Sequence, residues 1–132
     1  MPKNIIELNC DISGNDIINE IEFPERLERL ELTCNSDISG IKFPEGLKYL
    51  YYDCYSSYTP VDDLCLPPYL EVLKISECYD HPLDHLPEGL IHLMIESTPT
   101  DNREILGNLN NLPRSVKKIT IFFDGDPYTY HV

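Results

Sequence analysis

The chain has 132 residues, 42% of them hydrophobic, and a net charge of −13 from 23 Asp and Glu against 10 Lys and Arg. This length and composition fit a single domain with a real hydrophobic core. The excess of acid argues against binding nucleic acid or an anionic membrane, since both require clustered Lys and Arg.

Targeting signals and cysteine usage point to the inside of a cell. The first ten residues, MPKNIIELNC, are too short and too quickly acidic for a secretory leader. No apolar run approaches the ~18 residues that a membrane-spanning helix needs. The five cysteines are an odd number, which does not suit a paired disulfide framework. We therefore expect reduced thiols in an intracellular, cytoplasmic protein.

One ten-residue phrase recurs along almost the whole chain, and its clearest copy is LPEGLIHLMI at 86–95. Each copy has a proline, a leucine or similar residue three positions later, and then x-x-Leu-x-Leu or a close variant. The copies begin near residues 2, 23, 43, 66, 86 and 112, and their prolines are 20 to 26 residues apart. A period of this length predicts a solenoid. We expect one domain over 1–132, with a C-terminal cap over 123–132.

The apolar positions within each copy predict a strand. In Leu27-x-x-Leu30-x-Leu32 the last two leucines alternate with polar residues, the period of a strand with one buried face. The proline ahead of them fixes φ and prevents a helix from running through. Strands are predicted near 6–10, 28–33, 48–53, 71–76, 91–96 and 117–122. Stacked copies would pair them in one curved parallel sheet.

The connectors are expected to close the core from the other side. Their apolar residues include Ile21, Ile38, Ile41, Leu64 and Leu83. In the longest connector, Asp101 with Glu104 three positions later resembles a capping box, which predicts a short helix ending at Gly107. The tail from Asp124 breaks the phrase and should fold over the last strand as a cap, or fray.

The phrase Leu-x-x-Leu-x-Leu followed by a small polar residue resembles a leucine-rich repeat. Counted from the first leucine, position nine holds Ser13, Asn35, Tyr55, Cys78, Thr98 and Asp124. The resemblance implies that Asn35, Cys78 and Thr98 point inward and bond to the backbone of neighbouring coils. Tyr55 and Asp124 depart from that pattern. The implied fold is a right-handed α/β-class solenoid of about six short repeats, mostly β with little helix.

A connector carries a narrower resemblance. Tyr79-Asp80-His81-Pro82-Leu83, followed by Leu86-Pro87-x-x-Leu90, is similar to the FNIP subclass of leucine-rich repeats. Tyr58-Thr59-Pro60-Val61 is a looser copy. FNIP repeats are abundant in social amoebae and in giant viruses that infect amoebae. The resemblance therefore implies an amoebal or a viral protein, and in the viral case the cytoplasm of an infected host cell.

Alternate strand residues should face the concave side of the sheet, opposite the core. Six of them would line up across three neighbouring strands and form one surface, which we call the concave patch: Tyr49, Tyr51, Val72, Lys74, His92 and Met94. Tyr and Met are residue types that anchor protein interfaces. The alternative is that tyrosine and β-branched residues simply suit a sheet surface.

Cysteine and histidine residues suggest two kinds of chemical site, a zinc site and a thiol nucleophile. Cys65, Cys78, His81 and His85 have a spacing that superficially resembles a zinc site. However, position nine turns Cys78 inward, and Pro82 prevents the two histidines from sharing a helical face. Cys78, Asp80 and His81 also suggest a thiol nucleophile, but neighbours on one bend rarely align as a triad. We expect no metal, no cofactor and no catalytic residue.

The first strand should leave an unpaired edge, since no cap precedes it. Ile5, Ile6 and Leu8 would lie on this edge, screened by Glu7 and Asp11. Unless that screening suffices, the edge would pair with another copy and form a homodimer.

The sequence thus favours a non-enzymatic module that binds a partner protein through the concave patch. The alternative is a structural, self-assembling repeat protein that associates through edge strands or solenoid ends.

Overall fold

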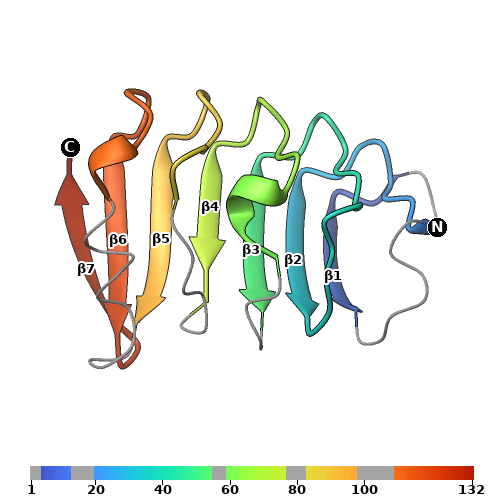
Figure 1. The fold of residues 1–132 in the computed structure, drawn as a ribbon, viewed down its shortest axis with the longest axis horizontal. Helices are drawn as coiled ribbons and strands as arrows, with labels where there is room; N and C mark the ends of the chain where they lie inside the picture. The colour runs from blue at the N-terminus through green and yellow to red at the C-terminus, as the bar shows by residue number, and fades with distance from the viewer. Residues whose placement is uncertain (1–3, 13–19, 55–58, 77–82, 98–108) are drawn as a thin grey trace.

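A computed structural model describes residues 4–12, 20–54, 59–76, 83–97 and 109–132. These residues are mostly strands in one sheet with almost no helix, arranged as a β-solenoid of about 4 turns. The strands lie in chain order across the sheet (Figure 1). They are β1 (Glu7–Ile12), β2 (Arg29–Cys34), β3 (Tyr49–Cys54), β4 (Val72–Ile75), β5 (His92–Ser97), β6 (Lys118–Phe123) and β7 (Asp126–His131). The described connectors hold two 3-10 turns, η2 (Val61–Asp63) and η3 (Leu109–Asn111).

The predicted parallel sheet is confirmed for β1 to β6. Each strand begins one residue after its predicted start. The residue at the predicted start lies just before the strand, and in β2 to β6 its N–H already bonds to the preceding coil. Consecutive N–H groups of Lys48 and Tyr49, for example, both donate to the carbonyl of Glu28 on the preceding coil, at 2.8 and 3.0 Å. The same forked bond recurs at the start of β2, β4, β5 and β6.

A β-turn at each proline aims the chain into its strand. The carbonyl of Pro24 accepts a hydrogen bond from the N–H of Leu27 at 3.1 Å, which closes a four-residue turn. The same bond joins Pro44 to Leu47, Pro67 to Leu70, Pro87 to Leu90 and Pro113 to Val116. All five turn-closing residues are buried, so the turn places the first core side chain of each copy.

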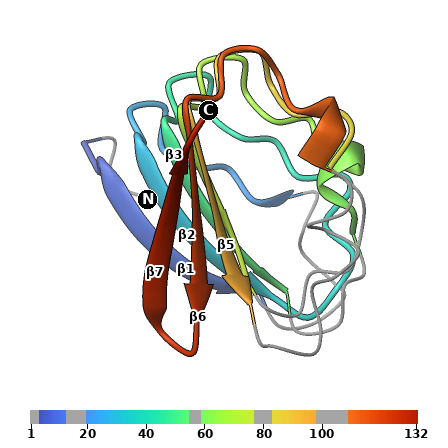
Figure 2. The same ribbon diagram turned by 90° about the vertical axis from the view of Figure 1, so that its left-hand side faces the viewer.

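The sheet forms one wall of the solenoid and the connectors form the other, as the view along the stack shows (Figure 2). Core residues come from both walls. The connector residues predicted to close the core are buried at Ile38, Ile41, Leu64 and Leu83, and half-buried at Ile21.

A polar network that is buried at Tyr52 and Thr59 and reaches the surface at Asp37 joins successive coils. The fully buried Tyr52 donates its hydroxyl to the carbonyl of Thr59 at 2.9 Å. The Thr59 hydroxyl in turn donates to Asp37 and accepts from the N–H of Ile38, both at 2.9 Å. The pKa of Asp37 is lowered by the N–H of Ser39 and then by the Thr59 hydroxyl. Buried polar atoms of adjacent coils therefore satisfy one another.

The prediction of an inward ladder at position nine is wrong at Asn35, which is exposed. Its carbonyl oxygen accepts from the hydroxyl of Ser36 at 3.2 Å. Asp124 is also exposed. Ser13, Tyr55, Cys78 and Thr98 lie outside the described residues, as does the predicted helix over 101–107.

Cysteine side chains fill the core just ahead of position nine. Cys34 and Cys54 are register partners at the ends of β2 and β3, and both are buried. Burial raises the pKa of the Cys34 thiol to about 11 and also raises that of Cys10. Cys34 is therefore a neutral thiol at physiological pH and packs as a small apolar side chain.

The tail does not fray but folds back along the last strand, within the sheet rather than over it. It forms β7, which pairs antiparallel with β6 and extends the sheet in its own plane. Asp124 and Gly125 make the two-residue turn, with φ of 50° and 88°, a combination that suits Asp-Gly in a β-hairpin. Because the chain reverses here, the sixth copy does not complete a coil.

Two glycines at the same place in the Pro-x-x-Leu turn give a test of coil stacking. A Cβ on Gly89 would lie 2.6 Å from the carbonyl oxygen of Pro68 on the preceding coil, whereas a Cβ on Gly46 would meet nothing within 4 Å. Gly89→Ala should lower the free energy of unfolding by about 1–3 kcal/mol through overpacking. Gly46→Ala should leave it unchanged or raise it by about 0.4–1 kcal/mol, since it restricts the unfolded chain. Urea denaturation measures both, and equal effects would contradict this packing.

Candidate functional site: the concave face of the sheet

The sheet register brings the concave patch together as predicted. Tyr49 lies opposite Val72, which lies opposite His92. Tyr51, Lys74 and Met94 form the next row across the same strands. All six side chains are half-buried, in contrast to the fully buried residues that alternate with them on β3, β4 and β5. The patch is therefore one contiguous, partly accessible surface.

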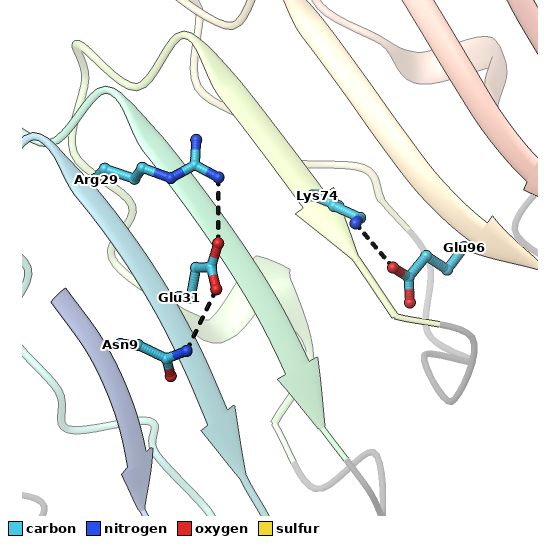
Figure 3. Close-up of polar contacts among 5 residues, drawn as sticks. All are labelled: Asn9, Arg29, Glu31, Lys74 and Glu96. Carbon is cyan, nitrogen blue, oxygen red and sulfur yellow. Dashed lines mark hydrogen bonds and ion pairs between the residues drawn. The ribbon is translucent and has the colours of Figure 1, made fainter. Parts of the chain in front are cut away.

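Glu96 on β5 links the centre of the patch across three strands. Its carboxylate accepts a hydrogen bond from the Tyr51 hydroxyl at 2.9 Å. It also forms an ion pair with Lys74 at 2.8 Å, which Figure 3 shows. Burial and the bond to Glu96 raise the pKa of Tyr51. Tyr51 therefore acts as a neutral hydroxyl donor across the physiological range.

The Lys74 ammonium also contacts two aromatic rings. It lies 4.6 Å from the centroid of the Tyr51 ring and 5.1 Å from that of Phe122 on β6. The lysine side chain is only 20% exposed. A carboxylate and two ring faces thus hold its charge in place, an arrangement in which cation–π attraction adds to the ion pair.

A second cluster lies toward β1. The Arg29 guanidinium stacks 3.7 Å above the Tyr49 ring. It also forms an ion pair with Glu31 at 3.1 Å, which Figure 3 shows. Asn9 on β1 donates to the other oxygen of Glu31 at 3.4 Å. The side chains of this ion pair are 40% and 37% exposed, so the pair adds little stability. Its effect is to fix the orientation of Tyr49.

His92 begins a chain of hydrogen bonds that leads to the C-terminal edge. Its Nε2 lies 2.8 Å from Thr120 Oγ1 on β6, which lies 3.1 Å from Thr129 Oγ1 on β7. Burial lowers the pKa of His92, and the charge of Lys118 lowers it further. The imidazole is therefore mainly neutral near pH 7.

Three residues at the centre of these contacts lie at alternate strand positions, which the sequence assigns to the concave face, but they are not among the six of the patch: Arg29, Glu96 and Phe122. A signal for Glu96 was present, since it follows Met94 by two and is therefore diagonal to Lys74, where opposite charges attract. By the same alternation, the sequence places Ser76 on this side, two residues after Lys74. It is buried, and its hydroxyl has no hydrogen-bond partner.

Two of the four residues with zinc-like spacing, Cys65 and His85, are described, and their surroundings do not support a zinc site. Cys65 is exposed, and His85 lies 3.4 Å from Asp62 of the preceding connector, which also accepts the His85 N–H at 2.9 Å. Cys78 and His81 lie outside the described residues, as does Asp80 of the proposed triad. Among described residues, no three His, Cys, Asp or Glu side chains are grouped to hold a metal.

A groove on the connector side was not predicted. It has a volume of about 590 Å³, and the stacked rings of Phe23 and Phe43, 6.2 Å apart, form part of its wall. Its charged lining residues, Glu22, Glu25, Lys42 and Glu45, are all exposed. On the concave face, by contrast, Lys74 and Glu96 are paired and mostly covered, so we take that face as the candidate site.

No family model matches the chain, and a search of curated proteins finds no match. Within the described part of the chain, no helix is long and apolar enough to cross a membrane.

The lowered pKa of His92 predicts a pH effect on stability. Unfolded histidine has a pKa of about 6.5, so on acidification the unfolded chain takes up this proton before the folded chain does. The stability that His92 contributes is therefore fully present at a pH above the unfolded pKa, and it is lost as the pH falls below that value. His92→Gln should lose less stability than wild type between pH 7 and pH 5, measured as urea midpoints. Parallel curves for the two proteins would contradict the assignment.

Proposed function

We propose that this chain is a leucine-rich-repeat solenoid of the FNIP subclass that binds a partner protein through its concave face. The repeated Leu-x-x-Leu-x-Leu phrase and its connectors support the family. The observation that carries the function is the ordered surface around Tyr51, Lys74 and Glu96. Here aromatic and charged side chains are half-exposed and already hold one another in place.

Preorganisation favours recognition of another protein. Binding costs about 0.5–1.5 kcal/mol for each flexible side chain that becomes fixed. On this face Lys74, Tyr51 and Arg29 are already fixed by neighbours, so less of that cost remains. Aromatic residues, Met and Arg are also the types enriched in the centres of interfaces.

A non-enzymatic role fits the state of the polar groups. Tyr51 has a raised pKa and donates to Glu96, while Cys34 is a buried neutral thiol. His92 is engaged with Thr120. These groups serve neighbouring side chains rather than an open reaction site. We therefore propose no cofactor and no bound metal.

The partner is a protein rather than nucleic acid or a membrane, given the net charge of −13. Following the FNIP resemblance, we propose that the protein works in the cytoplasm of an amoeba, or of an amoeba infected by a giant virus.

The double substitution Tyr51→Ala with Met94→Ala should abolish capture of this partner from an amoebal lysate by immobilised protein. Interface anchors cost upward of about 2 kcal/mol each when truncated, so a partner once identified should bind at least ~30-fold more weakly. The matched control is Tyr69→Ala, which removes a tyrosine that is 68% exposed on a turn away from the sheet. Thermal melts check that both variants fold. If the double variant captures the same protein as wild type, the patch is not the contact surface.

A further inference from the structure

The two outer edges of the sheet, β1 and β7, carry matching sets of outward backbone groups. On β1, the carbonyls of Ile6 and Ile12 accept hydrogen bonds from Glu28 and Asn35, so they point toward β2. Because backbone direction alternates along a strand, the N–H and C=O groups of three residues point outward. They belong to Glu7, Asn9 and Asp11.

On β7, the N–H of Val132 donates to the carbonyl of Lys117 at 2.9 Å. The same alternation then turns Tyr128 and Tyr130 toward β6, and it turns Pro127, Thr129 and His131 outward. Pro127 has no N–H, so this edge offers one donor fewer than β1.

We propose that copies of this chain associate head to tail, with β7 of one copy pairing antiparallel with β1 of the next. Antiparallel pairing follows because β1 to β6 run in one direction and β7 runs in the other. The register pairs His131 with Glu7, Thr129 with Asn9, and Pro127 with Asp11. On both strands the outward backbone groups recur every second residue, and this register places them opposite one another.

This register also keeps the two faces of the sheet continuous. Asn9 lies opposite Glu31, and Thr129 lies opposite Thr120, so both belong to the concave face. Residues directly opposite in an antiparallel pair project to the same side. The concave face of one copy would therefore continue into that of the next.

Each end of the solenoid leaves apolar surface that the other end can cover. Tyr128 and Tyr130 lie opposite the buried Ile121 and Ile119 but are themselves 51% and 55% exposed. At the first coil, Leu8 and Cys10 are only partly buried, although their partners on β2 are fully buried. Head-to-tail pairing places the two tyrosines beside these core-side residues of β1.

Charge favours contact between unlike ends. The last coil, from residue 112 onward, carries three of the ten basic residues of the chain, Arg114, Lys117 and Lys118, against two acidic ones, Asp124 and Asp126. The first coil carries acidic side chains that are all exposed: Glu7, Asp11, Glu20 and Glu22. Two first coils would repel each other, whereas a first and a last coil attract. The interface is thus heterologous, and association does not stop at a dimer.

Two proline substitutions test this interface without removing a backbone hydrogen bond inside the sheet. Asn9→Pro blocks the β1 edge, and Thr129→Pro blocks the β7 edge. In light scattering after size exclusion, the wild-type mass should rise with concentration, and each variant alone should remain at the monomer mass. An equimolar mixture should form a dimer of twice 15.3 kDa and no larger species, since each variant keeps one intact edge.

Three results would overturn the proposal. They are a wild type that is monomeric at every concentration, self-association of either variant alone, and a mixture that stays monomeric while wild type assembles. Circular dichroism melts show whether the variants fold. If a proline variant does not, Glu7→Lys and His131→Glu are used instead: each alone should assemble more weakly than wild type, and their mixture should assemble again because the new lysine then faces the new glutamate. Asp53→Lys is the control on the same face at mid-sheet. The Tyr51→Ala, Met94→Ala protein should still assemble, so this proposal and the concave-face proposal fail separately.

Discussion

The hydrogen bond that a proline carbonyl accepts from the N–H three residues later governs the rest of this structure. It recurs at five of the described turns, and after each turn two adjacent N–H groups share one carbonyl of the preceding coil. The turn fixes where a strand begins, and the forked bond fixes its register against its neighbour. Since side chains alternate strictly along a strand, these bonds decide which residues enter the core and which face outward. The same alternation of buried and outward residues therefore recurs in every coil.

The alternation of buried and outward residues determines which residues form the concave face. The chemistry of that face depends on the side chains at those outward positions. Ion pairs at protein surfaces contribute only about 0–1 kcal/mol, so Lys74 and Glu96 contribute more to geometry than to folding. Their value is positional, because a carboxylate from β5 and two rings from β3 and β6 hold Lys74 in place. A rigid, aromatic and partly desolvated surface has the properties of an interface centre more than those of a reaction site.

Periodicity predicted what backbone geometry controls and missed what individual side chains control. The strands, the rows of the concave patch and the buried connector residues all follow from spacing. Asn35 was misplaced because position nine was assigned by family resemblance, whereas this coil turns the residue outward. The role of Glu96 was missed because long side chains reach across strands. β7 was missed because the tail lacks the repeated phrase, although Asp124-Gly125 between apolar runs is itself a hairpin signal.

The reversal at Asp124 and Gly125 also decides how the two ends of the solenoid relate. A stack of parallel coils exposes its core at both ends and needs caps. Here the last strand turns back and remains in the sheet, so Tyr128 and Tyr130 cover the core only in part. Pro127 removes one edge donor, which weakens pairing without preventing it. If copies do join end to end, the concave patch repeats along one continuous sheet, and a multivalent partner would bind the array more tightly than a single copy.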